Sequence, residues 1–240
     1  MLEINIKQAV ACADMALSDY VKLCIFDMDG TAVQYANSSF QSSWDAVGIA
    51  AGKEEEWIRR RDYYFPKHDL YQEWFEGNCN LLNGVEVQPI LDRVLPPPYT
   101  PGFREFCGYV KSEGVKIGLV SSGVDLVANC INKDVSLDFV VANILHVSEG
   151  KFTGTGEQHV PLWGKGEIVK RYLALNKVDF KQAAYFGDHD NDRGAWSRVG
   201  LRIGISLKNH DLHSYVDYSF KDFYGALELF QRIAGQKDFK

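Results

Sequence analysis

Short apolar runs recur along the chain and alternate with longer segments of helical character. Four of these runs, each four to six residues long, predict buried strands, at 21–26, 116–120, 183–186 and 201–205. Helical stretches such as 101–113 and 165–175 lie between them. Strands that alternate with helices are typical of a parallel sheet covered by helices. We therefore predict an α/β fold built on a Rossmann-like parallel sheet.

Two segments depart from this alternation. Residues 144–154 alternate polar and apolar positions around Glu149-Gly150, which predicts a β-hairpin. The long segment between the first two strands, about 37–95, has helical character and holds three of the five tryptophans. It ends in the proline-dense stretch 96–102, which interrupts regular structure. We therefore predict that this segment is a helical module inserted into the α/β core.

The pattern divides the chain into three parts. We predict an N-terminal extension over 1–20, an α/β core over 21–35 and 100–235, and a helical cap over 36–99.

Charge and cysteine content exclude several classes of function. The chain has 26 Lys and Arg against 32 Asp and Glu and lacks a long basic block, which argues against nucleic-acid binding. No apolar run approaches the roughly 20 residues that a membrane-spanning helix needs, and residues 1–19 lack a secretory signal. The five cysteines are scattered and never have C-x-x-C spacing, which favours a reducing, cytoplasmic location. These patterns leave the oligomeric state open.

Acidic residues follow two of the predicted strands. Asp27 and Asp29 end the first strand, and Asp188 and Asp192 follow the strand at 183–186. The carboxyl ends of parallel strands face one crevice, so the two acidic pairs are expected to meet there. Carboxylates in one crevice repel each other unless a cation lies between them, and Mg²⁺ takes carboxylate oxygens while leaving room for phosphate. We therefore predict a magnesium site, with Asp190 as an exposed turn residue.

Two further segments supply groups that bind phosphate. Ser121, Ser122 and Gly123 follow the second strand and precede a predicted helix, where a hydroxyl and backbone N–H groups form a phosphate site. Lys165 opens the helix at 165–175, and its ammonium offsets the surplus negative charge. The alternatives are a helix-capping role for the serines and a solvated surface position for the lysine.

Taken together, these segments resemble a known family. The strings FDMDGT (26–31), LVSSG (119–123), Lys165 and GDHDND (187–192) stand in the order of the four motifs of the haloacid dehalogenase superfamily. Their spacing resembles its phosphoserine-phosphatase-like branch, with a cap inserted after the first motif, and the resemblance covers about residues 21–220. It implies a magnesium-dependent phosphatase that acts on a small phosphorylated substrate.

The resemblance also implies roles for the acidic residues. Asp27 is then the nucleophile that forms an aspartyl-phosphate, and Asp29 is the general acid and base. Mg²⁺ is held by the side chains of Asp27 and Asp188 and by the carbonyl of Asp29, while Asp192 orients metal-bound water. Ser121 hydrogen-bonds the phosphoryl group.

Lys165 is implied to steady both Asp27 and the phosphate. Two positions depart from the branch. His189 replaces a glycine of the fourth motif, and we interpret it as an orienting loop residue or a substrate contact. Residues 33–39 lack the acidic side chain that holds the ammonium of phosphoserine. The sequence therefore leaves open whether phosphoserine is accepted.

The cap contains the basic triplet 59–61. Successive helical residues lie about 100° apart, so one or two of the three arginines are expected to face the crevice. We predict Arg60 as the binder of a second anionic group, with a solvated helix face as the alternative. A phosphotransferase or mutase differs only in the phosphoryl acceptor and stays open. A non-catalytic phosphate-binding protein is the other alternative, which the presence of both Asp27 and Asp29 disfavours.

Overall fold

The structure is a computed structural model that describes residues 16–35 and 40–235. Most of the predicted N-terminal extension, residues 1–15, and the first residues of the predicted cap, 36–39, lie outside the described residues.

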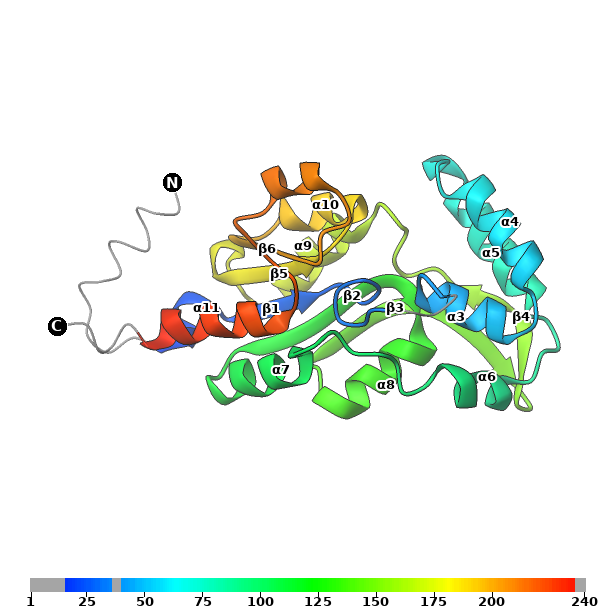
Figure 1. The fold of residues 1–240 in the computed structure, drawn as a ribbon, viewed down its shortest axis with the longest axis horizontal. Helices are drawn as coiled ribbons and strands as arrows, with labels where there is room; N and C mark the ends of the chain where they lie inside the picture. The colour runs from blue at the N-terminus through cyan, green and yellow to red at the C-terminus, as the bar shows by residue number, and fades with distance from the viewer. Residues whose placement is uncertain (1–15, 36–39, 236–240) are drawn as a thin grey trace.

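A single sheet of seven strands forms the centre of the molecule (Figure 1). Its order is β4-β3-β2-β1-β5-β6-β7, and every neighbouring pair is parallel except β3 with β4. The strands are β1 (Leu23–Phe26), β2 (Lys116–Val124), β3 (Phe139–Ser148), β4 (Lys151–Glu157), β5 (Ala183–Gly187), β6 (Leu201–Ile205) and β7 (Tyr218–Phe220). The predicted α/β fold with a Rossmann-like parallel sheet is thereby confirmed.

Helices cover both faces of this sheet (Figure 1). One face carries α2 (Leu17–Tyr20), α7 (Phe103–Ser112), α8 (Asp125–Val135) and α11 (Phe223–Gly235), and the other carries α9 (Lys165–Leu175) and α10 (Arg193–Trp196). Side chains of a strand alternate between the faces. Cys24 and Phe26 therefore join the first core, while Leu23 and Ile25 join the second. All four are fully buried, which explains the continuous apolar run at 21–26.

The hairpin predicted around Glu149-Gly150 connects β3 and β4. Both turn residues have positive φ, 50° and 76°, as a two-residue hairpin turn with the twist of its strands requires. The first strand is longer than predicted, because β3 begins at Phe139 and pairs with β2 before it reaches the hairpin. The sequence pattern did not separate this first half of β3 from the segment before it, and it also did not reveal the short edge strand β7.

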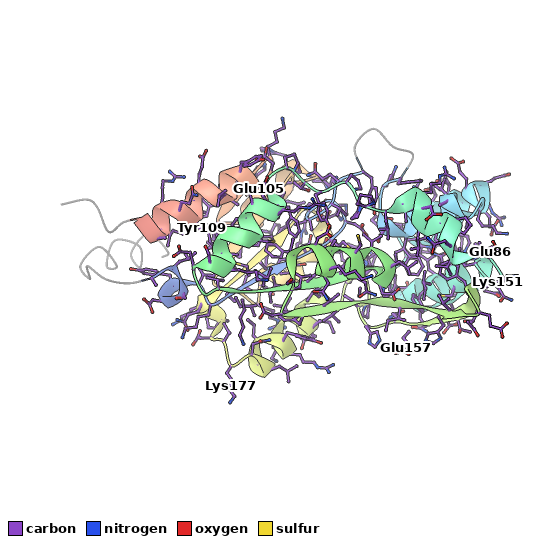
Figure 2. All side chains as sticks on the ribbon, turned by 90° about the horizontal axis from the view of Figure 1, so that it is seen from below. Glu86, Glu105, Tyr109, Lys151, Glu157 and Lys177 are labelled. Carbon is purple, nitrogen blue, oxygen red and sulfur yellow. The ribbon has the colours of Figure 1, made fainter. Side chains whose placement is uncertain are left out.

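The chain between β1 and β2 is helical, as predicted. It contains α3 (Ser43–Ala50), α4 (Glu54–Tyr64), the 3-10 helix η1 (His68–Leu70), α5 (Tyr71–Leu81) and α6 (Val87–Val94). The turn before α6 runs along β4, where Val87 N donates to Gly150 O at 2.9 Å and Phe152 N donates to Val85 O at 3.0 Å. Figure 2 shows Glu86 and Lys151, which form a β-bridge at this place. These hydrogen bonds hold the inserted helices beside the hairpin. The limits 36–99 of the cap stay a prediction.

Within the described ranges, no helix combines the length and the apolar character needed to cross a bilayer.

Candidate active site

Three neighbouring strands deliver the predicted site residues to one edge of the sheet. Asp27 directly follows β1, and Asp188 directly follows β5. Ser121 lies in the last part of β2, and β1 pairs with both β2 and β5. Lys165 is the first residue of α9. The structure therefore brings together side chains that are more than 150 residues apart in the chain.

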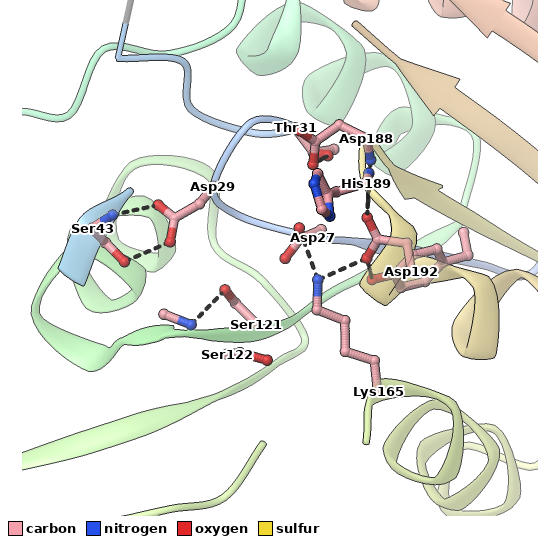
Figure 3. A network of polar contacts seen from close by, with 12 residues as sticks. Asp27, Asp29, Thr31, Ser43, Ser121, Ser122, Lys165, Asp188, His189 and Asp192 are labelled. Atoms are coloured by element: carbon pink, nitrogen blue, oxygen red, sulfur yellow. Dashed lines mark hydrogen bonds and ion pairs between the residues drawn. The ribbon is translucent and has the colours of Figure 1, made fainter. Parts of the chain in front are cut away.

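Lys165 lies between two carboxylates (Figure 3). Its Nζ atom is 2.8 Å from Asp27 Oδ2 and 2.7 Å from Asp192 Oδ1. The Lys165 side chain is only 1% exposed, so it is not the solvated surface lysine of the alternative interpretation. Carboxylate oxygens of Asp27, Asp188 and Asp192 all lie within 4.8 Å of one another. Lys165 therefore contacts two of three clustered carboxylates, while Lys208 Nζ lies 3.7 Å from Oδ2 of the third, Asp188.

This surplus of negative charge changes the protonation of the cluster. Burial raises the pKa of Asp27 to about 7, although Lys165 opposes this rise. Burial and the neighbouring carboxylates raise the pKa of Asp188 well above its usual range. Burial lowers the pKa of Lys165, but Asp192 and Asp27 outweigh it and raise the pKa above its ordinary value. The three carboxylates outnumber Lys165 and the exposed Lys208, which leaves a negative charge that a divalent cation would balance.

The hydrogen bonds show which carboxylates have oxygens to offer such a cation. Asp192 Oδ1 accepts from Lys165 Nζ and, at 2.8 Å, from Tyr185 OH, while Asp192 Oδ2 accepts the backbone N–H groups of Asp188 and His189 at 2.9 and 3.1 Å. Both Asp192 oxygens are thus used to hold Lys165 and the loop. Asp27 and Asp188 line the cavity and present hard oxygen ligands, which suit Mg²⁺.

A glycine allows the loop after β1 to approach Asp188. Gly30 has a φ of +87°, and a Cβ atom at this position would lie 2.1 Å from Asp188 Oδ2. The neighbouring Thr31 Oγ1 donates to Asp188 Oδ1 at 3.3 Å. A side chain at residue 30 would therefore displace one of the candidate metal ligands.

The segment Ser121-Ser122-Gly123 is built into the end of β2. Ser121 is 1% exposed, and its Oγ accepts the backbone N–H of Gly123 at 3.0 Å. Ser122 Oγ donates to Pro161 O at 3.2 Å. Helix α8 begins later, with Val124 at its N-cap position, so neither serine caps it. All three residues of the segment line the cavity, as expected for phosphate binders.

The carbonyl of Ser122 connects this segment to the inserted helices. It accepts hydrogen bonds from Trp44 Nε1 at 2.9 Å, Tyr71 OH at 3.2 Å and Asn143 Nδ2 at 2.8 Å. Trp44 and Tyr71 belong to α3 and α5. The inserted helices therefore contact the candidate phosphate-binding segment directly.

Asp29 is held by the first residue of α3. Its carboxylate accepts from the backbone N–H and the hydroxyl of Ser43, and the distances are 2.8 and 2.7 Å (Figure 3). Burial raises the pKa of Asp29 to about 6, and the two Ser43 hydrogen bonds oppose this rise. A carboxyl with a pKa near neutrality can both give and take a proton at physiological pH.

A cavity of about 800 Å³ lies between these groups and the inserted helices. Arg61 lines it, with NH1 2.9 Å from Asp45 Oδ2, whereas Arg60 does not. The prediction that Arg60 contacts the substrate is therefore not supported, because the rotation between successive helical residues turns its guanidinium to Asn78 Oδ1, 3.1 Å away. The Arg59 side chain is 74% exposed, so Arg61 is the arginine of the triplet that reaches the cavity.

The fourth motif divides its side chains between the cavity and the surface. His189 lines the cavity, and its ring centre is 5.9 Å from that of Phe65 in the residues after α4. Asp190 instead pairs with Arg193 and accepts from Asn209 Nδ2 at 3.2 Å, outside the cavity. The placement of Asp190 in a surface turn agrees with the prediction.

Several site residues escaped the sequence analysis. Ser43 and Tyr185 bond Asp29 and Asp192 respectively, and Trp44 and Tyr71 bond the phosphate-binding segment. The serines at 42 and 43 before a helical stretch signal a helix start, but this signal does not reveal a carboxylate from a distant segment. Tyr185 lies in a predicted strand, and its neighbours in the sequence do not indicate that its hydroxyl bonds Asp192.

Comparison with known proteins agrees with this geometry. Residues 24–196 match the profile of a family described as haloacid dehalogenase-like hydrolase. The chain is 27% identical over 191 residues to the phosphoserine phosphatase of Methanocaldococcus jannaschii, with 78% of the chain and 86% of that protein covered. It is 27% identical over 207 residues to the phosphoserine phosphatase of Streptomyces coelicolor, of which it spans 48%, while 84% of the chain is covered.

Solved structures that resemble this chain also include phosphoserine phosphatases. A phospho-aspartyl intermediate analogue of phosphoserine phosphatase superposes with a TM-score of 0.73 at 25% identity, covering 87% of this chain and 98% of that one. A substrate-bound phosphoserine phosphatase complex superposes with the same TM-score and coverage. A probable phosphoserine phosphatase from Vibrio cholerae, 18% identical, shares the fold with a TM-score of 0.74, covering 91% of this chain and 68% of that one.

Proposed function

The chain belongs to the haloacid dehalogenase-like hydrolase family and is a phosphatase of the phosphoserine-phosphatase-like type, and from this premise we propose the rest of its chemistry. The proposal is a magnesium-dependent hydrolysis of a small phosphomonoester through an aspartyl-phosphate. The observation that carries it is the contact of Lys165 Nζ with Asp27 and Asp192 inside a triad of buried carboxylates.

Asp27 is the proposed nucleophile. Its Oδ atom attacks phosphorus, the bond between phosphorus and the ester oxygen breaks, and the phosphoryl group is transferred to the carboxylate. The ion pair with Lys165 favours the ionised form that this attack requires. A related phosphoserine phosphatase has been solved as an analogue of its phospho-aspartyl intermediate, which supports this route.

Asp29 is the proposed proton carrier. It gives a proton to the leaving alcohol and then takes one from the water that attacks the aspartyl-phosphate. Its pKa of about 6 suits both directions at neutral pH. Ser121 and the backbone around Gly123 would hold the phosphoryl oxygens, and Lys165 would offset their charge.

Magnesium fits the donor set of the site. Asp27 and Asp188, with the backbone carbonyl of Asp29, would hold it, and Asp192 would support this set through its hydrogen bonds. Bound there, Mg²⁺ supplies positive charge that stabilises the phosphoryl group in the transition state. The phosphoryl group of a substrate adds negative charge to a cluster that already carries a net negative charge. The positive charge of Mg²⁺ would offset it.

The substrate is proposed to be metabolite-sized. The inserted helices contact the phosphate-binding segment through Trp44 and Tyr71, so they form one side of the cavity. A cavity of about 800 Å³ between helices and sheet admits a small molecule but not a folded protein. The relatives are named for phosphoserine, a small phosphomonoester, which supports this size.

Hydrolysis of p-nitrophenyl phosphate by the purified protein tests the proposal. EDTA should abolish turnover, and Mg²⁺ should restore it. Asp27→Asn should lower kcat by several orders of magnitude, because the nucleophile is removed, while the exposed control Asp211→Asn should leave kcat unchanged. Turnover that persists in EDTA, or in Asp27→Asn, would contradict the proposal.

A further inference from the structure

The walls of the cavity, rather than its phosphate end, identify the substrate class. Resting on the proposed function, we infer that the enzyme selects phosphomonoesters whose alcohol carries a neutral aromatic ring, in preference to the zwitterionic side group of phosphoserine. The inference is drawn from the charges and the aromatic side chains that line the cavity.

The charged residues on the cap side of the cavity form a pair. Lys208 also lines the cavity, but its Nζ lies at the candidate metal site, 3.7 Å from Asp188 Oδ2. Away from the catalytic carboxylates, Lys165 and Lys208, the described charged residues that line the cavity are Asp45 and Arg61, which bond at 2.9 Å. The pair has no net charge, so it attracts a charged group of the substrate less strongly than a lone carboxylate or guanidinium would. A neutral ring leaves the pair intact.

Aromatic side chains make up much of the remaining wall. They are Tyr35, Phe40, Trp44, Phe65, Tyr71 and Trp74. Trp74 is central to this group, since Phe65 and Tyr71 pack against it edge-on with ring centres 6.4 and 5.9 Å away. Phe65 is 40% exposed, although large apolar side chains are usually buried. Flat rings gain both apolar burial and favourable stacking on such a surface.

Three primary alkyl phosphates test the inference, because their ester groups are alike and only the attached group differs. We expect kcat/KM for 2-phenylethyl phosphate to exceed that for n-propyl phosphate and for phosphoserine by at least about tenfold. Equal values for the three esters, or a preference for phosphoserine, would overturn the inference while hydrolysis itself still supports the proposed function. Hydrolysis of none of them, and none of p-nitrophenyl phosphate, would overturn both.

Variants of Trp74 locate the preference. Trp74→Ala should lower kcat/KM for 2-phenylethyl phosphate at least about tenfold and that for n-propyl phosphate less than about twofold. Trp74→Phe keeps an aromatic ring at this position, so it should retain 2-phenylethyl phosphate turnover. Tyr63→Ala is the matched control, because Tyr63 is 53% exposed on α4 and outside the cavity. An equal loss on all esters in Trp74→Ala would show a structural role and overturn the assignment.

Discussion

The hydroxyl of Ser43 lies 2.7 Å from Asp29 Oδ2 and also accepts the backbone N–H of Val124 at 3.2 Å. One side chain of α3 thus joins the loop after β1 to the end of β2. The arrangement is tight, because a Cβ atom at Gly123 would lie 2.4 Å from Ser43 Oγ and 2.6 Å from Asp29 Oδ2. The backbone N–H of Val124 donates to the hydroxyl oxygen of Ser43, and the hydroxyl hydrogen of Ser43 is donated to Asp29. The position of α3 therefore sets the orientation of the candidate proton carrier.

Ser43→Ala removes this hydroxyl and keeps the backbone N–H. We expect kcat for n-propyl phosphate to fall about tenfold to a hundredfold, because a hydrogen bond to a charged group is lost and Asp29 is less well oriented. The loss should be smaller for p-nitrophenyl phosphate, whose leaving group needs no proton, and KM should change little. Ser43→Thr restores the hydroxyl and should restore kcat. An equal loss on both substrates, or no rescue by threonine, would contradict this role.

Lys165→Met should destabilise the metal-free protein. It leaves the buried carboxylates of Asp27 and Asp192 without their ammonium, and breaking a buried ion pair in this way costs about 3–5 kcal/mol. Urea unfolding at pH 7 in EDTA measures the change. Lys170→Met, on the same helix but exposed, is the control and should change the free energy of unfolding by less than about 0.5 kcal/mol. Equal stabilities of the two variants would show that Lys165 does not hold the cluster together.

The stability of the metal-free protein should fall as pH rises from about 4 to 7. The pKa of Asp27 is raised from 3.8 to about 7, so the folded protein still holds a proton that the unfolded chain has released. This contribution is complete below the unfolded pKa and is lost as pH rises through the folded pKa. It amounts to up to about 4 kcal/mol. Asp188 acts in the same direction.

Unfolding by urea in EDTA at a series of pH values measures this slope. Asp27→Asn should make the slope shallower, because the amide does not titrate while Asp188 and Asp29, whose pKa values are also raised, still do. Saturating Mg²⁺ should stabilise the wild-type protein most near pH 7. A stability that is constant or rises between pH 4 and 7 in EDTA would contradict the predicted protonation of the cluster.

The two candidate metal-site carboxylates of the fourth motif should differ in effect. Asp188→Asn should abolish Mg²⁺ binding, because Asp188 presents a ligand oxygen to the cavity. Asp192→Asn should weaken binding only about tenfold to a hundredfold, because Asp192 acts through its bonds to Lys165, Tyr185 and the loop. Calorimetric titration with Mg²⁺ compares them, with Asp211→Asn as the exposed control. Equal losses in both variants would place Asp192 in direct contact with the ion.

Local patterns in the sequence determined the main elements and the chemistry of this protein. The apolar runs around Ile25 and Tyr185 mark strands that are buried on both faces. These strands can therefore be located in the sequence without knowledge of any tertiary contact. The acids after them predict a cation site, because the carboxyl ends of parallel strands meet at one edge. The role of Asp27 as nucleophile is implied by the family resemblance. The hairpin was predicted from the alternating runs around Glu149-Gly150, and both of these turn residues adopt positive φ in the structure.

Contacts between distant segments were decided only by the tertiary structure. Arg59, Arg60 and Arg61 are equivalent in sequence. Only the packing of α4 against α5 directs Arg60 to Asn78, and only its packing against α3 directs Arg61 to Asp45. Ser43 likewise becomes a partner of Asp29 only because α3 packs on the end of β2. Sequence patterns record the period and polarity of each element, whereas the direction of a single side chain depends on how the elements pack.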